Sequence, residues 1–330
     1  MTVQITIIGL GQVGSSIGLA LASQKNIKRV GHDKSLDAAR AAQKAGAVDE
    51  TKFNLPASVS NANVVLLCIP LNEVEETLKI IAPDLQEGTV IMDTAPAKAT
   101  VATWVEKHLP QGRYYIGLSP AAGVDYLHGI DLGVDSARAD LFQKGLFLIN
   151  TQRGVPGDAV KLATDLCELL GAKAILSDTM EVDGLLASTH ILPQLIGAAL
   201  LDSTVDQPGW HEARKLAARP YATATAAFTC QDEISSLGMA ALTNRENVVR
   251  VIDAYMASLK ELRDKISAGD ETSVSTFLDD AFKARTRWFN DRAKADWEGL
   301  EREKADVPSF GERLGHMFMG RIKDRSKKKE

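Results

Sequence analysis

The sequence predicts an α/β fold, in which a doubly wound parallel sheet is followed by an all-helical domain. Three observations lead to this prediction. In the first half, near-continuous apolar runs of strand length alternate with amphipathic helical stretches, which is typical of a parallel sheet covered on both faces. A glycine-rich turn joins the first apolar run to the first helical stretch. Beyond residue 178 the strand signals disappear and helical patterns continue alone.

The apolar runs and the stretches between them give the elements of the first domain. The predicted strands are Ile5–Gly9, Arg29–His32, Val64–Ile69, Thr89–Asp93, Tyr114–Gly117, Leu146–Asn150 and Lys173–Leu176. The amphipathic patterns predict helices at Ser35–Ala45, Asn72–Ala82 and Asp158–Leu170. We therefore place a first domain at residues 1–178 and a helical domain at residues 179–330.

The predicted helices of the second domain are long and apolar. They cover Thr179–Asp202, Glu212–Ala218, Pro220–Cys230, Ser235–Ala268 and Ser273–Glu303, and the longest of them is expected to be interrupted. The basic segment Arg321–Lys329 is expected to be a solvated end. Helices of this length cannot bury their apolar stripes within a small monomeric domain. A homodimer, in which two copies share helical faces across a two-fold axis, is the simplest arrangement that covers them.

Composition excludes several classes of function. The 330-residue chain has 45% hydrophobic and 25% charged residues, which is typical of a soluble globular protein, and its net charge of −5 disfavours nucleic acid as a partner. Its three cysteines are widely spaced, so we expect a cytoplasmic location and no metal. The first strand begins close to Met1 and no apolar run reaches the about 18 residues of a membrane span. Neither a signal peptide nor a membrane partner is expected.

The turn after the first strand has the pattern Gly9-x-Gly11-x-x-Gly14. Gly9 allows a tight turn, Gly11 lets the backbone approach a pyrophosphate, and Gly14 allows helix and strand to pack closely. The diphosphate would rest on the N–H groups at the helix start, where the helix dipole favours negative charge. We predict a Rossmann-type dinucleotide site with contacts from Gly9, Leu10, Gly11, Gln12, Val13 and Gly14.

Asp33 closes the second predicted strand, roughly 20 residues beyond the glycine turn. A carboxylate at this place hydrogen-bonds the ribose hydroxyls of NAD and repels the 2′-phosphate of NADP. NAD is therefore the expected cofactor, although the adjacent Lys34 and Ser35 leave NADP open.

The carboxyl ends of the later strands supply further candidates, because ligands of doubly wound sheets bind outside these ends. Ile69, Pro70, Asp93 and Ser119 fall there, and we expect them to line the nicotinamide side of the cleft. The alternative is that Pro70 and Pro120 are turn residues only.

The predicted helix Thr179–Asp202 is almost entirely apolar, yet Asp183, His190 and Gln194 form a polar stripe along it. Pro193 lies in the same helix and leaves the carbonyl four residues earlier without its usual donor, so a kink is expected there. His190 is accordingly the leading catalytic candidate. A satisfied core histidine is the alternative.

A basic group consists of Arg214, Lys215 and Arg219. It suits a small carboxylate-bearing substrate, because charge-assisted hydrogen bonds hold such groups. A solvated helix face is the alternative explanation. No two of the other histidines have metal-ligand spacing supported by nearby carboxylates, which again disfavours a metal site.

Three motifs follow one another in a telling order. They are Gly-Leu-Gly-Gln-Val-Gly from residue 9, Ser-Pro-Ala-Ala-Gly at 119–123 and Thr-His-Ile-Leu-Pro-Gln at 189–194. Together they resemble the prephenate/arogenate dehydrogenase family of tyrosine biosynthesis, over roughly residues 3–265. The resemblance implies a Rossmann domain followed by an all-helical dimerisation domain. It also implies an oxidative decarboxylation of prephenate or arogenate, in which NAD(P) accepts a hydride and loss of carbon dioxide aromatises the ring.

The sequence departs from the family pattern at several site positions. Ser119 stands where the family has a histidine that interacts with the substrate hydroxyl, and Pro96 replaces the serine of an Asp-x-x-Ser-x-Lys pattern. Gln194 replaces the second histidine of the helix motif. The arginine expected a little before Asn244 is missing, since residues 220–229 contain none.

Other positions match, and the resemblance implies roles for them. Thr189, His190 and Pro193 are retained. The implied site uses His190 and Ser119 in catalysis, and it binds the substrate through Thr189, Gln194 and Arg219. A serine hydroxyl cannot take a proton at neutral pH without a separate base. Two alternatives follow: either His190 is the sole acid/base group, or the protein oxidises prephenate poorly.

Two other functions remain open at this point. A β-hydroxyacid dehydrogenase would carry a lysine one helical turn before an asparagine, but Ala240 and Thr243 precede Asn244 and Asn247 at that spacing. A non-catalytic nucleotide-binding or regulatory protein would account for the missing histidine and arginine.

Overall fold

The computed structural model describes residues 2–129, 133–228, 234–295 and 297. These residues form two compact units, one within residues up to 182 together with Trp297, and the other within residues 183–295. The chain passes from the first unit to the second within α7 (Thr179–Leu186), at whose start the predicted boundary lies. Lys173 then donates a hydrogen bond to the carbonyl of Trp297, so the chain returns to the first unit after the helical one.

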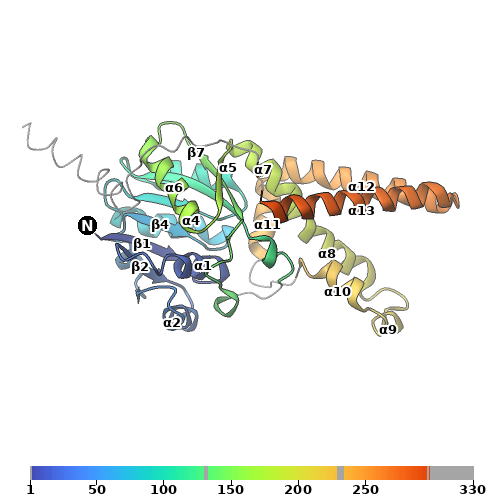
Figure 1. Cartoon of the computed structure of the whole chain (residues 1–330), viewed down its shortest axis with the longest axis horizontal. Coiled ribbons are helices and arrows are strands. Elements are labelled where there is room, and N and C mark those ends of the chain that lie inside the picture. Colours follow the sequence, from blue (N-terminus) through green and yellow to red (C-terminus); the bar gives the residue numbers. More distant parts are fainter. Residues whose placement is uncertain (1, 130–132, 229–233, 296, 298–330) are drawn as a thin grey trace, which may run out of the picture. The chain divides into compact units, whose positions relative to one another are not determined.

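One sheet organises the first unit, with the strand order β3-β2-β1-β4-β5-β6-β7-β8 (Figure 1). Its strands are β1 (Val3–Ile8), β2 (Ile27–His32), β3 (Glu50–Thr51), β4 (Val64–Leu67), β5 (Val90–Asp93), β6 (Tyr114–Ala121), β7 (Leu146–Thr151) and β8 (Lys173–Leu176). The predicted parallel pairing is confirmed for β1 to β6. The two-residue strand β3 has no apolar run of its own and was not predicted.

The last two strands depart from the predicted parallel arrangement. β7 runs antiparallel to β6, and β8 runs parallel to β7. Parallel neighbours need a long crossover, usually a helix. The described residues between β6 and β7 contain only the short 3₁₀ turns η2 (Val124–Tyr126) and η3 (Val134–Ser136), so β7 turns back beside β6.

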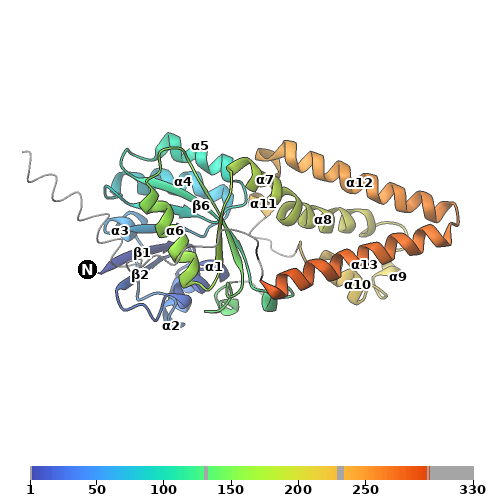
Figure 2. The same cartoon turned by 45° about the horizontal axis from the view of Figure 1, so that its top comes forward.

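Helices cover both sides of this sheet (Figures 1 and 2). They are α1 (Gln12–Ala20), α2 (Leu36–Lys44), α3 (Leu55–Val59), α4 (Leu71–Ile81), α5 (Lys98–His108) and α6 (Gly157–Leu169), with a 3₁₀ turn η1 (Ala82–Asp84). The predicted helices correspond to α2, α4 and α6. Ser35 starts α2 because its hydroxyl accepts a hydrogen bond from the amide of Ala38, and Asn54 caps α3 in the same way.

Side chains of the central strands alternate between two different environments. One face of β1, β4, β5 and β6 is apolar and packs with α1, α2 and α6 around a single core, through Ile5, Ile7, Val64, Leu66, Val90, Met92, Ile116 and Leu118. The intervening residues of β5, β6 and β7 point to the opposite face. That opposite face carries Asp93, Tyr115, Gly117, Ser119 and Asn150, which belong to the candidate site.

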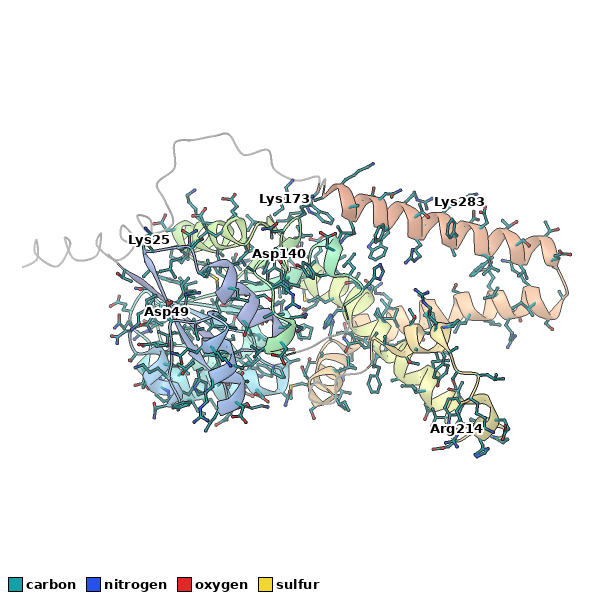
Figure 3. All side chains as sticks on the ribbon, turned by 60° about the horizontal axis from the view of Figure 1, so that its bottom comes forward. Lys25, Asp49, Asp140, Lys173, Arg214 and Lys283 are labelled. Atoms are coloured by element: carbon teal, nitrogen blue, oxygen red, sulfur yellow. The ribbon has the colours of Figure 1, made fainter. Side chains whose placement is uncertain are left out.

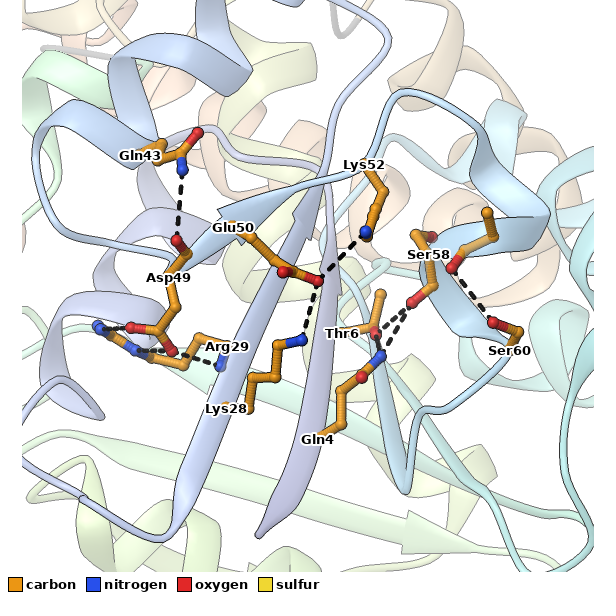
Figure 4. A network of polar contacts seen from close by, with 11 residues as sticks. Gln4, Thr6, Lys28, Arg29, Gln43, Asp49, Glu50, Lys52, Ser58 and Ser60 are labelled. Atoms are coloured by element: carbon orange, nitrogen blue, oxygen red, sulfur yellow. Dashed lines mark hydrogen bonds and ion pairs between the residues drawn. The ribbon is translucent and has the colours of Figure 1, made fainter.

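A buried guanidinium fixes the edge of the sheet near β2 (Figure 4). Arg29 donates hydrogen bonds to the carbonyls of Gly18 (2.9 Å) and Gly46 (2.8 Å) and forms an ion pair with Asp49 at 2.5 Å. Burial opposes the ionisation of Asp49, but the hydrogen bonds and charge of Arg29 outweigh it and hold the pKa of Asp49 below its usual value. The network joins the end of α1 to β2 and to the turn after α2.

The second unit is helical, as predicted. It contains the π-helical turn η4 (Ala187–Ile191), α8 (Leu192–Thr204), α9 (Trp210–Ala213), α10 (Arg219–Thr225), α11 (Ile234–Thr243), α12 (Arg245–Ser267) and α13 (Glu271–Lys294). The predicted helix 235–268 is divided into α11 and α12 at Asn244, and most of the predicted helix 212–218 is not helical. Cys230, Glu303 and the basic segment 321–329 lie outside the described residues.

Much apolar surface of the second unit stays uncovered. The helices α12 and α13 form a hairpin whose arms diverge from their turn (Figure 2). Large apolar side chains on these arms are exposed, namely Val249, Met256, Leu259, Ile266, Leu278, Phe282 and Trp288. Between 48% and 67% of the surface of each of these residues stays accessible in the single chain.

The helical run Thr179–Thr204 corrects one sequence expectation. Its 26 residues have a mean hydropathy of 1.5 in their most apolar window, and only 17% of that window is buried. By length and composition alone this run is apolar enough to cross a membrane, whereas the sequence reading found no such run, because polar residues such as Asp183 and His190 interrupt it. A core helix of a water-soluble protein meets the same criteria, so the finding is weak evidence for a membrane.

Candidate active site

Of the three glycines in the turn between β1 and α1, only Gly11 has space for a side chain. Gly9 has a φ of +90°, and a Cβ there would lie 2.3 Å from the carbonyl oxygen of Cys68. A Cβ at Gly14 would lie 2.0 Å from the carbonyl oxygen of Gly9. A Cβ at Gly11 would meet nothing within 4 Å. The protein itself therefore requires Gly9 and Gly14, whereas Gly11 faces open space at the start of α1, as a bound pyrophosphate needs.

The other residues of the turn are fixed by contacts with the residues around it. Asp33 accepts a hydrogen bond from the amide of Leu10 at 2.8 Å through one oxygen and from the amide of Ser35 through the other. Gln12 donates to the carbonyl of Ser136 at 3.5 Å, and Val13 packs against the apolar core. The carboxylate predicted to bind ribose thus also fixes the backbone of the glycine turn, a link that the sequence did not indicate.

β4 and β5 end at one edge of the sheet, level with Gly117 of β6, whereas β6 continues to Ala121, so that Ser119 lies within the strand and not at its predicted end. Asp93 pairs with Leu67 on one side and with Gly117 on the other, and Ser119 lies two residues further along β6. Ile69 and Pro70 follow β4 directly, and Pro70 precedes the first turn of α4. The structure therefore brings these sequence-predicted residues together at one edge.

Asp93 itself is completely buried and bound by its own neighbours. One carboxylate oxygen accepts hydrogen bonds from Lys98 (2.9 Å) and from the amide of Ala95, and the other accepts a 2.6 Å hydrogen bond from Tyr115. Neither Asp93 nor Lys98 has any accessible side-chain surface. The side chain of Asp93 is thus a buried structural group at the strand end, and no part of it is accessible to a cofactor. Its hydrogen bond with Tyr115 was not predicted from the sequence.

Ser119 and Asn150 carry buried polar atoms that lack partners. Ser119 is 8% exposed and Asn150 is 1% exposed. The Asn150 amide nitrogen donates to Thr179 Oγ1 at 3.1 Å, but Asn150 Oδ1 and Ser119 Oγ have no hydrogen-bond partner among the described residues. Such atoms are uncommon in folded proteins and mark places where a ligand or water gains a hydrogen bond. The sequence reading missed Asn150, although a polar residue at the end of an apolar strand is a signal for it.

The histidine motif lies on a π-helical turn. In this turn, Ala187–Ile191, the amide of Leu192 bonds to the carbonyl of Ala187, five residues earlier. Pro193 has no N–H, so the regular helical hydrogen bonds cannot continue through it. The kink predicted at Pro193 therefore appears as a π-helical turn. Gln194 folds back and donates from its side chain to the carbonyl of His190 at 2.9 Å.

His190 has the properties of a neutral base. The residue keeps exposed surface, yet protein atoms crowd its ring, and this burial lowers the pKa of His190 from the usual 6.5. Its neighbour Thr189 donates to the carbonyl of Leu185 at 2.8 Å. At neutral pH the imidazole is therefore uncharged and has a lone pair that accepts a proton.

The other polar candidates of the second unit lie on separate elements. Asp183 is buried, and its carbonyl accepts a 2.8 Å hydrogen bond from the side chain of Asn244. Arg219 is exposed at the first residue of α10, and Arg214 lies at the surface after α9 (Figure 3). Lys215 forms an exposed ion pair with Glu212. No group of metal-ligating side chains occurs within the described parts of the chain.

Comparisons with known proteins point to one family. Residues 17–176 match the model of the prephenate dehydrogenase nucleotide-binding domain. The chain is 27% identical to cyclohexadienyl dehydrogenase of Zymomonas mobilis over 85% of this chain and 94% of that protein. It is 26% identical to prephenate dehydrogenase of Lactococcus lactis over 93% of this chain and 80% of that protein.

Solved structures share the fold. Prephenate dehydrogenase of A. aeolicus, in complex with hydroxyphenyl propionate and NAD+, has a TM-score of 0.75 at 20% identity, covering 87% of this chain and 98% of that one. Arogenate dehydrogenase of Synechocystis has a TM-score of 0.66 at 21% identity, covering 86% and 99%. Residues 17–176 thus match the nucleotide-binding domain of the prephenate dehydrogenase family, and the unit that contains them also includes β1 and the glycine turn.

Proposed function

We propose that this protein is an NAD-dependent dehydrogenase of the prephenate dehydrogenase type, which oxidatively decarboxylates prephenate, arogenate or a closely related carboxylate in tyrosine biosynthesis. The observation that carries the proposal is the open space at Gly11, in a turn whose Leu10 amide is held by Asp33. This turn directly precedes the residues that match the nucleotide-binding domain of the family. Relatives named as prephenate and cyclohexadienyl dehydrogenases support the choice of reaction.

The residues around the glycine turn fit NAD. The amides at the start of α1 would hold the pyrophosphate, and Asp33 would accept hydrogen bonds from the ribose hydroxyls and repel a 2′-phosphate. Lys34, which would favour such a phosphate, forms an ion pair with Glu73. NAD is therefore preferred over NADP. When bound, the nicotinamide supplies the hydride acceptor, and Ile69 and Pro70 would border it at the ends of the strands.

We expect Gly11→Ala to weaken NAD binding by about 10- to 100-fold without changing the fold. The added methyl group meets no atom of the protein but enters the space of the pyrophosphate, and overpacking of this kind costs about 1–3 kcal/mol. Calorimetric titration with NAD measures the loss, and thermal melting checks the fold. Gly238→Ala, which also points into open space but lies on α11, is the matched control. Unchanged NAD affinity in Gly11→Ala would contradict the assignment.

The acid/base chemistry falls to His190. Oxidation of a ring carbinol removes a hydride from carbon and a proton from oxygen. Carbon dioxide then leaves, the electrons of its broken bond to the ring complete the aromatic system as a phenolate, and the base returns the proton to that oxygen. His190 is neutral at physiological pH and takes the hydroxyl proton, a task that the Ser119 hydroxyl cannot perform. The charge that binds the substrate carboxylates is assigned to Arg219, and a hydrogen bond to them is assigned to the second amide hydrogen of Gln194. Thr189 would have to turn its hydroxyl away from the carbonyl of Leu185 to donate to a carboxylate.

The uncovered apolar surface of the second unit supports a homodimer. The exposed apolar residues of α12 and α13 and the little-buried run Thr179–Thr204 need a cover, and a second copy supplies an identical apolar surface. Analytical ultracentrifugation measures the assembly, and a monomer at micromolar concentration would rule the dimer out.

A cofactor-reduction assay tests the function directly. The purified protein is mixed with NAD or NADP and with prephenate or arogenate, and the absorbance of the reduced cofactor is followed. We expect faster reduction with NAD and with at least one of the two substrates. If no combination gives reduction above the enzyme-free control, the protein does not have this activity.

One alternative has a specific observation in its favour. Ser119 and Gln194 replace two family histidines, which suits a nucleotide-binding protein without catalysis. NAD binding that prephenate and arogenate leave unaffected, together with no turnover, would favour this alternative.

A further inference from the structure

The sheet face around Gly117 is polar on every side. Tyr115 and Ser119 lie two residues before and after Gly117 on β6, so their side chains share its face. Asp93 pairs with Gly117 from β5, and Asn150 pairs with it from β7. The four side chains therefore surround the position that has no side chain.

Gly117 is required by this arrangement. A Cβ at Gly117 would lie 2.2 Å from Oδ1 of Asn150 and 2.8 Å from its Cγ. The carboxamide of Asn150 thus extends over β6 into the space that the glycine leaves. Its amide nitrogen is anchored on the other side by Thr179.

The two halves of this polar face differ in their hydrogen bonding. On the β5 side, Asp93, Lys98 and Tyr115 satisfy one another. On the β7 side, Ser119 Oγ and Asn150 Oδ1 are more than nine-tenths buried and have no partner among the described residues. A buried polar group without a partner is unfavourable, so these two atoms are the places where a ligand atom gains most.

The chemistry of the two atoms defines which ligand group satisfies both of them. A serine hydroxyl donates one hydrogen bond and also accepts, whereas an amide oxygen only accepts. A ligand hydroxyl does both, because it accepts from Ser119 and donates to Asn150. A carboxylate or phosphate oxygen cannot donate, so it leaves Asn150 Oδ1 unsatisfied.

We propose that Ser119 and Asn150 together bind the hydroxyl group of the substrate, with Asn150 as the specificity-determining acceptor. The proposal rests on the proposed function, since it assigns the ring hydroxyl of that substrate to this pair. Asn150 orients the hydroxyl but is not a base. Its oxygen is an acceptor held in place by the bond of its amide nitrogen to Thr179, whereas the hydroxyl of Ser119 rotates, and Gly117 keeps the space for the carboxamide.

Matched ligands test this pairing without turnover. 3-(4-Hydroxyphenyl)propionate and 3-phenylpropionate differ only by one hydroxyl, and their binding to the NAD-loaded protein is measured by calorimetry. We expect the natural protein to prefer the hydroxylated ligand by about tenfold, which corresponds to one buried hydrogen bond. Asn150→Leu and Gly117→Ala are expected to lose this preference, the second by displacing the carboxamide while every polar group is kept.

Controls separate this pairing from general damage and from cofactor binding. Thr89→Val removes a different buried hydroxyl, at the opposite end of β5, and is expected to keep the preference. The proposal is overturned if the natural protein shows no preference, if both site variants keep it, or if Asn150→Leu weakens NAD binding as much as ligand binding. If the preference is present but neither prephenate nor arogenate is oxidised, the proposed reaction fails and the hydroxyl site stands.

Discussion

Replacing Lys98 with methionine is expected to lower the free energy of unfolding by about 3–5 kcal/mol, because the Asp93 carboxylate then stays buried without its ammonium partner. Lys98 and Asp93 have no accessible side-chain surface, and their closest atoms are 2.9 Å apart. Tyr115 and one backbone amide remain as donors to the carboxylate, which is too little to stabilise a charge in this environment. Urea unfolding followed by circular dichroism measures the change.

Two comparisons make this result specific. Lys79→Met removes an exposed ion pair with Glu76 and is expected to cost at most about 0.5 kcal/mol. The double variant Asp93→Asn with Lys98→Met removes both charges, and we expect it to regain part of the lost stability. A loss below about 1 kcal/mol in Lys98→Met would show that the buried pair is not needed for folding.

His190→Asn is expected to reduce kcat/KM by about 10²- to 10⁴-fold, the usual effect of removing a positioned acid/base group. The natural enzyme loses activity as the pH falls, because the base must be neutral to accept a proton. Burial lowers the pKa of His190 below 6.5, so the acidic limb of the kcat/KM profile is expected below pH 6.5. Steady-state rates between pH 5 and 8 test both points.

A surface histidine provides the control for this variant. His211 is exposed and contacts Glu212, and His211→Asn is expected to leave the rate and the pH profile unchanged. An acidic limb that persists unchanged in His190→Asn would assign that limb, and the proton transfer, to another group.

The parts of the fold that follow from local sequence were predictable. The turn at Gly9 and Gly14 could be predicted, because its geometry depends on residues within one short segment and only glycine fits at these two positions. The helix α2 could also be predicted, because Ser35 caps its start and its apolar residues recur at helical spacing. The disturbance at Pro193 was also predicted, but not its π-helical form, since the sequence shows only that a donor is missing.

The parts that depend on distant segments were not predictable. The direction of β7 is decided by how the chain between β6 and β7 packs, and apolar runs look alike in both directions. The surroundings of Asn150 follow from that direction, because the antiparallel register places it level with Gly117. The contacts of Asp93 with Tyr115 likewise join two strands and have no signature in either one.

The hydrogen bond from Lys173 to the carbonyl of Trp297 has a consequence for biosynthesis. Because Trp297 belongs to the first unit, the helical unit is an insertion in the order of the chain and not an appendage. The ribosome must therefore release every helix of the insertion before Lys173 can meet this acceptor. Nascent chains arrested just before Trp297 would carry Lys173 without that acceptor.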